Sequence, residues 1–278
     1  MPYARTDDGI RIYHETHGDG TPVVLAYGIG GNADLWDVNR DALAARHRLV
    51  LWEPRGHARS DSPADPARYS FARWTLDLRD VLDHLGIRSA HVGGLSLGAG
   101  IATRFALRFP RRVRSLLVTN SSSAAGLPLP VESLAMRVRS IEVTLAQGMD
   151  AMAEYAMAAN PNVAARVALD PSSKAEFYAY YRRLTPIGYA NSLRALLAMD
   201  YITAELRALR VPTLLIGGDR DPSLGPMKVM RRRVRGSRLI VLSPASHFAN
   251  RDQPDAWNRA VLTFLARCDR RAGAARRG

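Results

Sequence analysis

The chain has 278 residues, 47% of them hydrophobic, a formal net charge of +13 and a single cysteine, Cys268. This composition fits a packed globular fold of one large or two small domains and excludes an internal disulfide. A charge of this size is compatible with nucleic-acid binding. However, only two of the 39 basic residues are lysines, and the one internal basic cluster, at 231–235, has no interleaved aromatic residues. We therefore expect no nucleic-acid partner.

No apolar run approaches the ~18 residues of a membrane-spanning helix, and the first residues lack the apolar segment of a secretion signal. We therefore expect a cytoplasmic protein with no membrane partner.

Taken in chain order, the segment at 10–17 alternates apolar and polar residues, which predicts an edge strand. Continuous apolar runs predict buried strands at 22–27, 47–53, 90–92, 113–119, 211–217 and 238–242. Apolar spacings of three and four, with capping residues, predict helices from 32 or 34 to 46 and over 71–85, 97–107 and 254–268. Apolar strands alternating with helices indicate an α/β fold with a mostly parallel sheet and helices on both faces.

The stretch from about 121 to 209 interrupts this alternation, because its composition is helical and it contains no convincing strand. We predict a core formed by 1–122 and 205–267, and a helical cap at 123–204 over the carboxyl edge of the sheet. The tail at 268–278 is rich in Gly, Ala and Arg, so we expect it to be disordered.

One motif carries the chemistry: Gly94-Leu95-Ser96-Leu97-Gly98 lies between a predicted strand and a predicted helix. Gly-x-Ser-x-Gly at such a junction is typical of a nucleophile elbow, where crowding requires glycine on both sides of the serine. Ser96 then needs a base and an orienting acid. His247, in a loop after the last strand, is the favoured base; His57 is its competitor, and we expect His91 to be buried.

Five segments resemble the α/β-hydrolase family, in the branch of esterases, lactonases, haloperoxidases and C–C hydrolases. They are 27–31, 55–61, 94–98, 217–221 and 246–248, within a similarity that covers 9–122 and 205–267. The order Ser, Asp, His is also that of the family. Serine as nucleophile argues against the relatives that attack with aspartate.

The resemblance implies that Asp221 is the acid, that Asp219 shapes the turn, and that His57 is structural. Some members carry the acid after the strand before the cap, where this chain has Asn120, an amide that cannot replace a carboxylate. The implied oxyanion hole consists of two backbone N–H groups, those of Ile29 and Leu97.

Two departures stand out. The family usually has His-Gly where this chain has Tyr27-Gly28, and we expect Tyr27 to brace that loop through its hydroxyl. Ser246 stands where glycine usually precedes the histidine. Tyr27, Gly28 and Phe248 are the predicted substrate-binding residues.

The predicted reaction is hydrolysis of a small carboxylic ester or lactone, because 186–196 resembles the return from cap to core in 3-oxoadipate enol-lactonases. Alternatives are C–C hydrolysis of a β-diketone-type compound, perhydrolysis, or a catalytically silent ligand-binding protein. Arg182, Arg183 or Arg194 either clamps a substrate carboxylate or faces solvent. No metal-spaced cluster or dinucleotide motif occurs, so we predict no metal and no cofactor; the sequence leaves the oligomeric state open.

Overall fold

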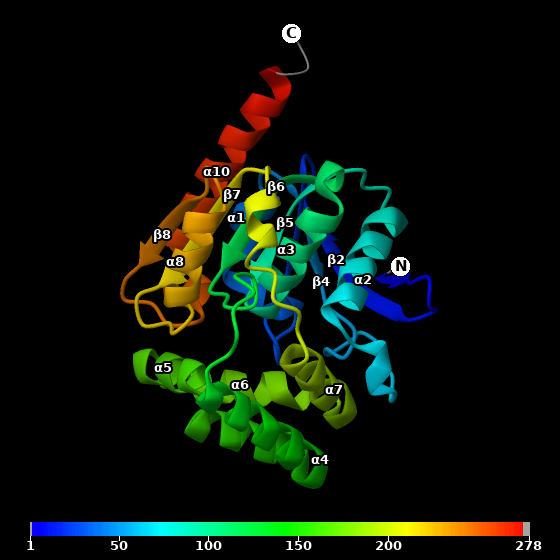
Figure 1. The fold of residues 1–278 in the computed structure, drawn as a ribbon, viewed down its shortest axis with the longest axis vertical. Coiled ribbons are helices and arrows are strands. Elements are labelled where there is room, and N and C mark those ends of the chain that lie inside the picture. The colour runs from blue at the N-terminus through cyan, green and yellow to red at the C-terminus, as the bar shows by residue number, and fades with distance from the viewer. Residues whose placement is uncertain (1, 275–278) are drawn as a thin grey trace.

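A computed structural model describes residues 2–274 (Figure 1). Its centre is an eight-stranded sheet of order β1-β2-β4-β3-β5-β6-β7-β8, in which β1, β2 and β4 pair antiparallel and every other pair is parallel. The strands are β1 Tyr3–Arg5, β2 Arg11–His17, β3 Pro22–Ala26, β4 Arg48–Trp52, β5 Ala90–Leu95, β6 Val113–Thr119, β7 Thr213–Gly218 and β8 Arg238–Leu242. The predicted mostly parallel α/β fold is confirmed.

Helices cover both faces of the sheet because its central strands are apolar on both sides. Val24 and Ala26 of β3 pack in one core cluster with α2, α3 and α8, whereas Val23 and Leu25 pack in a second cluster with α1 and α10. These helices are α1 Asp37–Ala44, α2 Phe71–His84, α3 Leu97–Arg108, α8 Leu224–Arg233 and α10 Pro254–Ala274. Short helices are η1 Ala33–Trp36, η2 Pro66–Arg68, η3 Pro110–Arg112, η4 Glu205–Ala208 and α9 Ala249–Asp252.

Four helices between β6 and β7 form a layer of their own beside the sheet (Figure 1). They are α4 Val131–Ala159, α5 Pro161–Leu169, α6 Ser173–Arg182 and α7 Pro186–Leu197. α4 breaks at Gly148, whose φ of 83° suits glycine. The helices share an apolar cluster, against which Ile29 and Phe248 of the sheet side also pack. Whether 123–204 is a separate cap domain stays a prediction.

Two expectations are wrong. The segment at 10–17 is not an edge strand, because β1 pairs with its outer side. The tail is not disordered from 268 on, because α10 continues to Ala274: Cys268 is buried and Asp269 accepts hydrogen bonds from Arg114, at 2.9 Å, and His91, at 3.2 Å. Residues 275–278 lie outside the described part of the chain. Within 2–274, the helices are too short or too polar to cross a membrane.

Candidate active site

Ser96 occupies the sharp turn between β5 and α3, with φ 53° and ψ −114°. A non-glycine residue at such a φ is strained, and strain of this kind persists where the surroundings fix the backbone. Here the fixing is steric: a Cβ on Gly94 or Gly98 would lie 2.3 or 2.2 Å from the Ala26 carbonyl oxygen. Both glycines are therefore required by the close approach of the turn to β3.

Hydrogen bonds hold the backbone of Ser96 on both sides. Its N–H donates to the Thr119 carbonyl at 3.0 Å. Its carbonyl accepts from the hydroxyls of Ser121 at 2.7 Å and Ser123 at 3.2 Å. The serines that follow β6 thus support the turn, a role that the sequence did not suggest.

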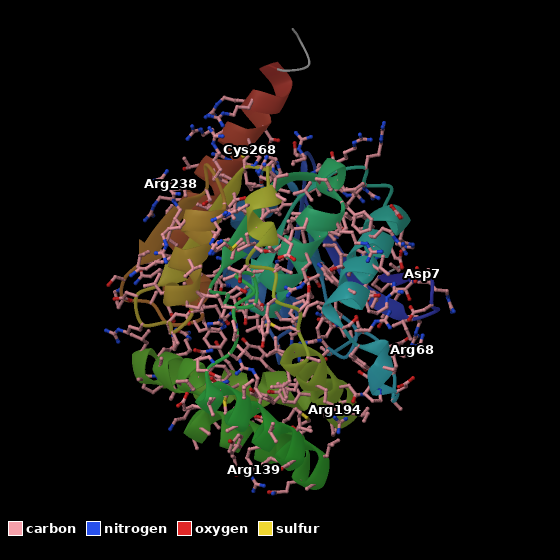
Figure 2. All side chains as sticks on the ribbon, in the orientation of Figure 1. Asp7, Arg68, Arg139, Arg194, Arg238 and Cys268 are labelled. Atoms are coloured by element: carbon pink, nitrogen blue, oxygen red, sulfur yellow. The ribbon has the colours of Figure 1, made fainter. Side chains whose placement is uncertain are left out.

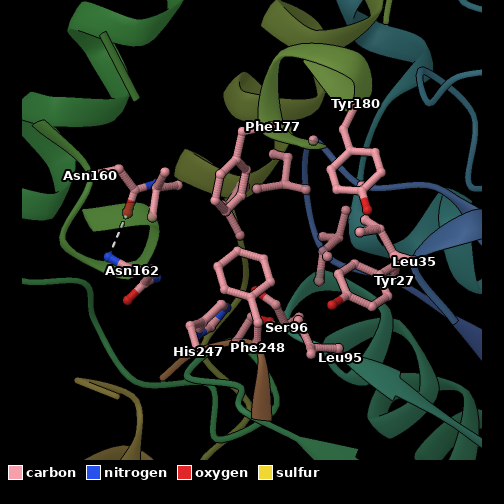
Figure 3. Close-up of a pocket in the computed structure, with 18 of the residues that line it drawn as sticks. Tyr27, Leu35, Leu95, Ser96, Asn160, Asn162, Phe177, Tyr180, His247 and Phe248 are labelled. Carbon is pink, nitrogen blue, oxygen red and sulfur yellow. Dashed lines mark hydrogen bonds between the residues drawn. The ribbon is translucent and has the colours of Figure 1, made fainter. Parts of the chain in front are cut away.

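His247 lies in the loop between β8 and α9, and Asp221 follows β7. The His247 Nδ1 is 3.0 Å from Asp221 Oδ1. Ser96 and His247 both line one cavity, and Figure 3 shows them close together on the same side of it. Within the described residues the two side chains do not hydrogen-bond to each other, a looseness common in serine and histidine pairs without substrate.

Asp221 is held as a carboxylate by several donors. The Asn120 amide donates to its Oδ2 at 2.5 Å, the Ser223 hydroxyl donates to the same oxygen, and the Ser223 N–H donates to Oδ1 at 3.0 Å. Burial raises the pKa of the Asp221 carboxyl, but the adjacent His247 and the Ser223 donors lower it more, so its pKa lies well below the ordinary range.

The competing residues lie elsewhere. His57 and His91 are buried outside the cavity lining, and burial lowers the pKa of each to about 4. Asp219 accepts from the Ala245 N–H at 2.8 Å and the Ser243 hydroxyl at 2.6 Å, so it ties the turn after β7 to the loop after β8. Asp221, rather than Asp219, accepts from the backbone N–H two residues on, that of Ser223.

Ile29 and Leu97, the predicted oxyanion donors, both line the cavity beside Ser96. Within the described chain, neither backbone N–H donates a hydrogen bond to another protein group. Leu97 is the first residue of α3, where helical geometry leaves the N–H without a partner and the helix dipole favours negative charge. Two free amides thus lie in the same cavity as the Ser96 hydroxyl.

The Tyr27 hydroxyl donates to Asn250 Oδ1 at 3.0 Å, and both side chains are buried. This bond ties the loop after β3 to α9, the short helix that follows His247 in the chain. Burial raises the pKa of the Tyr27 hydroxyl well above its ordinary value, so it stays a donor. A tyrosine can therefore brace the loop where the family usually has histidine.

The cavity lies between the sheet edge and the helical layer, with about 80 Å³ of space for water-sized molecules. Tyr27, Gly28 and Phe248, the predicted substrate-binding residues, line it. Phe177 of α6 packs edge-on against Phe248 with ring centroids 5.3 Å apart (Figure 3). Arg137 of α4 also lines it.

Ser246 replaces the usual glycine without disturbing the loop. Its N–H and hydroxyl donate to Asp252 Oδ2 at 2.5 and 2.6 Å. Arg166 of α5 donates to the other oxygen of Asp252 at 2.8 Å. The residue before His247 is therefore connected to the helical layer through one carboxylate.

The three arginines considered for a substrate carboxylate do not line the cavity. Arg182 pairs with Asp150 at 2.6 Å and Arg183 pairs with Asp34. Arg194 is exposed on α7 (Figure 2) and donates to its helix neighbour Asn191 at 2.7 Å. The structure therefore favours the second alternative, a position away from the substrate, for these three residues. The residues described form no group of three or more His, Cys, Asp and Glu that is arranged to hold a metal ion.

The chain is similar to several known proteins. A profile of the family described as alpha/beta hydrolase fold matches residues 21–254. The putative carbamate hydrolase RutD of Azorhizobium caulinodans is 32% identical over 97% of this chain and 100% of its own length. The 3-oxoadipate enol-lactonase 2 of Acinetobacter baylyi is 25% identical over 94% of this chain and 96% of its own. The crystal structure of the enol-lactonase from Burkholderia xenovorans LB400 matches with a TM-score of 0.84 at 25% identity, over 95% of this chain and 100% of that one.

Proposed function

The chain belongs to the α/β-hydrolase fold family, and from this premise we propose that it is a serine hydrolase that cleaves a small carboxylic ester or lactone through an acyl-enzyme on Ser96. One observation carries the proposal: a serine on a strained turn and a histidine paired with a buried carboxylate open into the same cavity. A serine hydroxyl is a weak nucleophile at neutral pH, and such a pair activates it.

In the first half of the reaction, Ser96 Oγ attacks the substrate carbonyl while His247 Nε2 takes the hydroxyl proton. Asp221 accepts from Nδ1, which fixes the tautomer and stabilises the imidazolium. The oxygen that becomes negative is received by the Ile29 and Leu97 amides.

In the second half, His247 returns its proton to the leaving alcohol as the tetrahedral intermediate collapses to the acyl-enzyme. A water molecule then gives a proton to His247 and attacks the acyl carbon. When the second tetrahedral intermediate collapses, His247 returns that proton to Ser96 Oγ, the acid leaves and Ser96 is regenerated. Each step uses groups of this chain, so the proposal includes no cofactor and no partner beyond a small-molecule substrate.

Ester or lactone is favoured because two of the similar proteins are named enol-lactonases. A carbamate is the second candidate, because a similar protein at 32% identity is named a putative carbamate hydrolase. The same nucleophile and oxyanion donors serve either carbonyl. C–C hydrolysis, perhydrolysis and ligand binding without catalysis remain as outcomes of the test.

The test measures turnover of short nitrophenyl esters, a panel of lactones and a nitrophenyl carbamate by wild type and by Ser96→Ala. We expect an initial burst of nitrophenol equal to the enzyme concentration, followed by slower turnover, and no turnover by Ser96→Ala. Turnover that persists in Ser96→Ala, or no turnover of the panel by wild type, would refute the proposal. Ser122→Ala is a matched control, because Ser122 lines the same cavity without hydrogen-bonding to Ser96 in the described chain.

A further inference from the structure

Arg137 brings a positive charge into a cavity that contains no acidic residue. It lines the cavity together with Ser96 and with apolar side chains such as Val163, Phe177 and Leu196. None of the cavity-lining residues in the described chain is Asp or Glu. Arg137 is thus a cation in the same space as the proposed nucleophile.

The helical period of α4 turns Arg137 inward. Ser133, Arg137, Ser140 and Thr144 follow one another at spacings of four, three and four, and all are buried or half-buried. Arg139, two residues on, is exposed and pairs with Glu142 at 2.8 Å; Figure 2 shows it on the outer side of the layer. The orientation of Arg137 is therefore a property of the helix, whereas Arg139 offers a matched outward-facing arginine.

Arg137 lacks a counter-charge. Its one hydrogen bond in the described chain goes to the Ser133 carbonyl, at 2.9 Å, and no carboxylate of residues 2–274 lies within ion-pair distance. Burial lowers the pKa of its guanidinium, which means that the charge is held in a poorly solvated place. An unpaired charge in such a place is costly to stability.

Four arginines with buried side chains in the described chain each pair with a carboxylate. Arg55 binds Asp77 at 2.7 Å, Arg104 binds Asp200 at 2.9 Å, Arg166 binds Asp252 at 2.8 Å, and Arg251 binds Glu176 at 3.1 Å. The fold thus provides a carboxylate for these arginines and leaves the guanidinium in the cavity unpaired.

We propose that Arg137 binds a free carboxylate of the substrate, so that the preferred substrates are small anionic esters or lactones. The inference rests on the proposed function. A guanidinium binds a carboxylate through two parallel N–H···O bonds, and in a confined cavity such a pair is strong and oriented. The anion would neutralise the half-buried charge and hold the carbonyl near Ser96.

The test compares two esters of similar shape, ethyl hydrogen succinate, which is anionic, and ethyl 4-methylpentanoate, which is neutral. We expect wild type to prefer the anionic ester. Arg137→Met should lower kcat/KM for it by about 30- to 100-fold, mainly through KM, because the loss of one partner of a buried ion pair has effects of this size. For the neutral ester, kcat/KM should change by less than about threefold. With the anionic ester, the kcat/KM of Arg137→Lys should lie between those of wild type and Arg137→Met.

Arg139→Met is the matched control and should behave like wild type with both esters. The proposal is overturned if wild type hydrolyses both esters without preferring the anionic one. It is also overturned if Arg137→Met lowers kcat/KM equally for both esters, which indicates a structural role.

A binding measurement separates this inference from the proposed function. Ser96→Ala protein should bind ethyl hydrogen succinate in calorimetry, and the added Arg137→Met change should remove that binding. If wild type hydrolyses neither these two esters nor the panel of nitrophenyl esters and lactones while this Arg137-dependent binding is present, the proposed function fails and the carboxylate site stands. If Ser96→Ala protein does not bind the monoester, or binds it equally without Arg137, the carboxylate site fails.

Discussion

Replacing Tyr27 by phenylalanine should destabilise the fold and slow catalysis. The ring would keep its edge-on packing against Trp36, with centroids 5.1 Å apart, and lose only the hydroxyl that donates to Asn250 Oδ1 at 3.0 Å. Because Tyr27 lies two residues before Ile29, the change loosens the loop that carries a proposed oxyanion donor.

The size of the effect follows from the surroundings of Asn250, which is fully buried. Its Nδ2 already donates to Asn39 Oδ1 at 2.9 Å and to the Leu35 carbonyl at 3.3 Å, so the amide cannot turn to find a new donor for its oxygen. A buried acceptor left without a partner costs about 1–3 kcal/mol. For a chain of this size, each kcal/mol lowers Tm by about 2–4 °C, so Tm should fall by roughly 2–12 °C.

Thermal unfolding and ester kinetics of the purified variant provide the assay. Complete loss of an oxyanion donor lowers kcat by about 10²–10³-fold, so a loosened donor should lower it by roughly 3- to 30-fold. Tyr201→Phe is the control, because Tyr201 is 60% exposed and the same atom is removed. A Tyr27→Phe protein with the Tm and kcat of wild type would refute the bracing role.

Three further changes test the site. Gly28→Ala should lower kcat by about 10²-fold, because its Cβ would lie 2.9 Å from the Cβ of Ser96, whereas Gly225→Ala, with open space around the new atom, should leave kcat unchanged. Asp221→Asn should lower kcat by about 10⁴-fold. The pKa of Asp221 lies below its ordinary value of ~3.9, so its carboxylate contributes fully to stability above that pH and less as the pH falls. The difference in unfolding free energy between wild type and Asp221→Asn, measured in urea, should therefore shrink from pH 6 to pH 3. A constant difference would contradict this. Asn120→Gly, which suits the φ of 44°, removes a donor to Asp221 and should lower kcat about tenfold with KM unchanged; an equal rise in KM would argue against a positioning role.

Most of the sheet could be predicted from the sequence because the signals are local. Apolar runs bounded by turn residues predict β6 and β8 with the same first and last residues that the structure shows. The glycines around Ser96 reflect a steric requirement that is visible within the five-residue motif at 94–98. Local composition gave a wrong prediction for the carboxyl-terminal segment from residue 268. There, composition indicated disorder, while α10 is extended by tertiary contacts of Asp269 with Arg114 and His91.

The contacts that complete the site join residues far apart in the chain. Asn120 donates to a carboxylate 101 residues away, and Tyr27 to an amide 223 residues away. Neither pairing leaves a local pattern. The inward arginine leaves a weak signal in the sequence, the spacing of polar residues along α4. That spacing does not single it out among the arginines of the helical layer; only packing shows that Arg182 and Arg183 bind acids and that Arg194 binds a neighbouring amide.

Covalent labelling tests the central claim most directly. Wild-type protein would be incubated with a fluorophosphonate, and the adduct would be measured by intact mass and located by peptide mapping. The account predicts one adduct per chain, on Ser96, that is slowed strongly in His247→Ala and absent in Ser96→Ala. Absence of an adduct in wild type, or an adduct on another residue together with undiminished hydrolysis by Ser96→Ala, would contradict it.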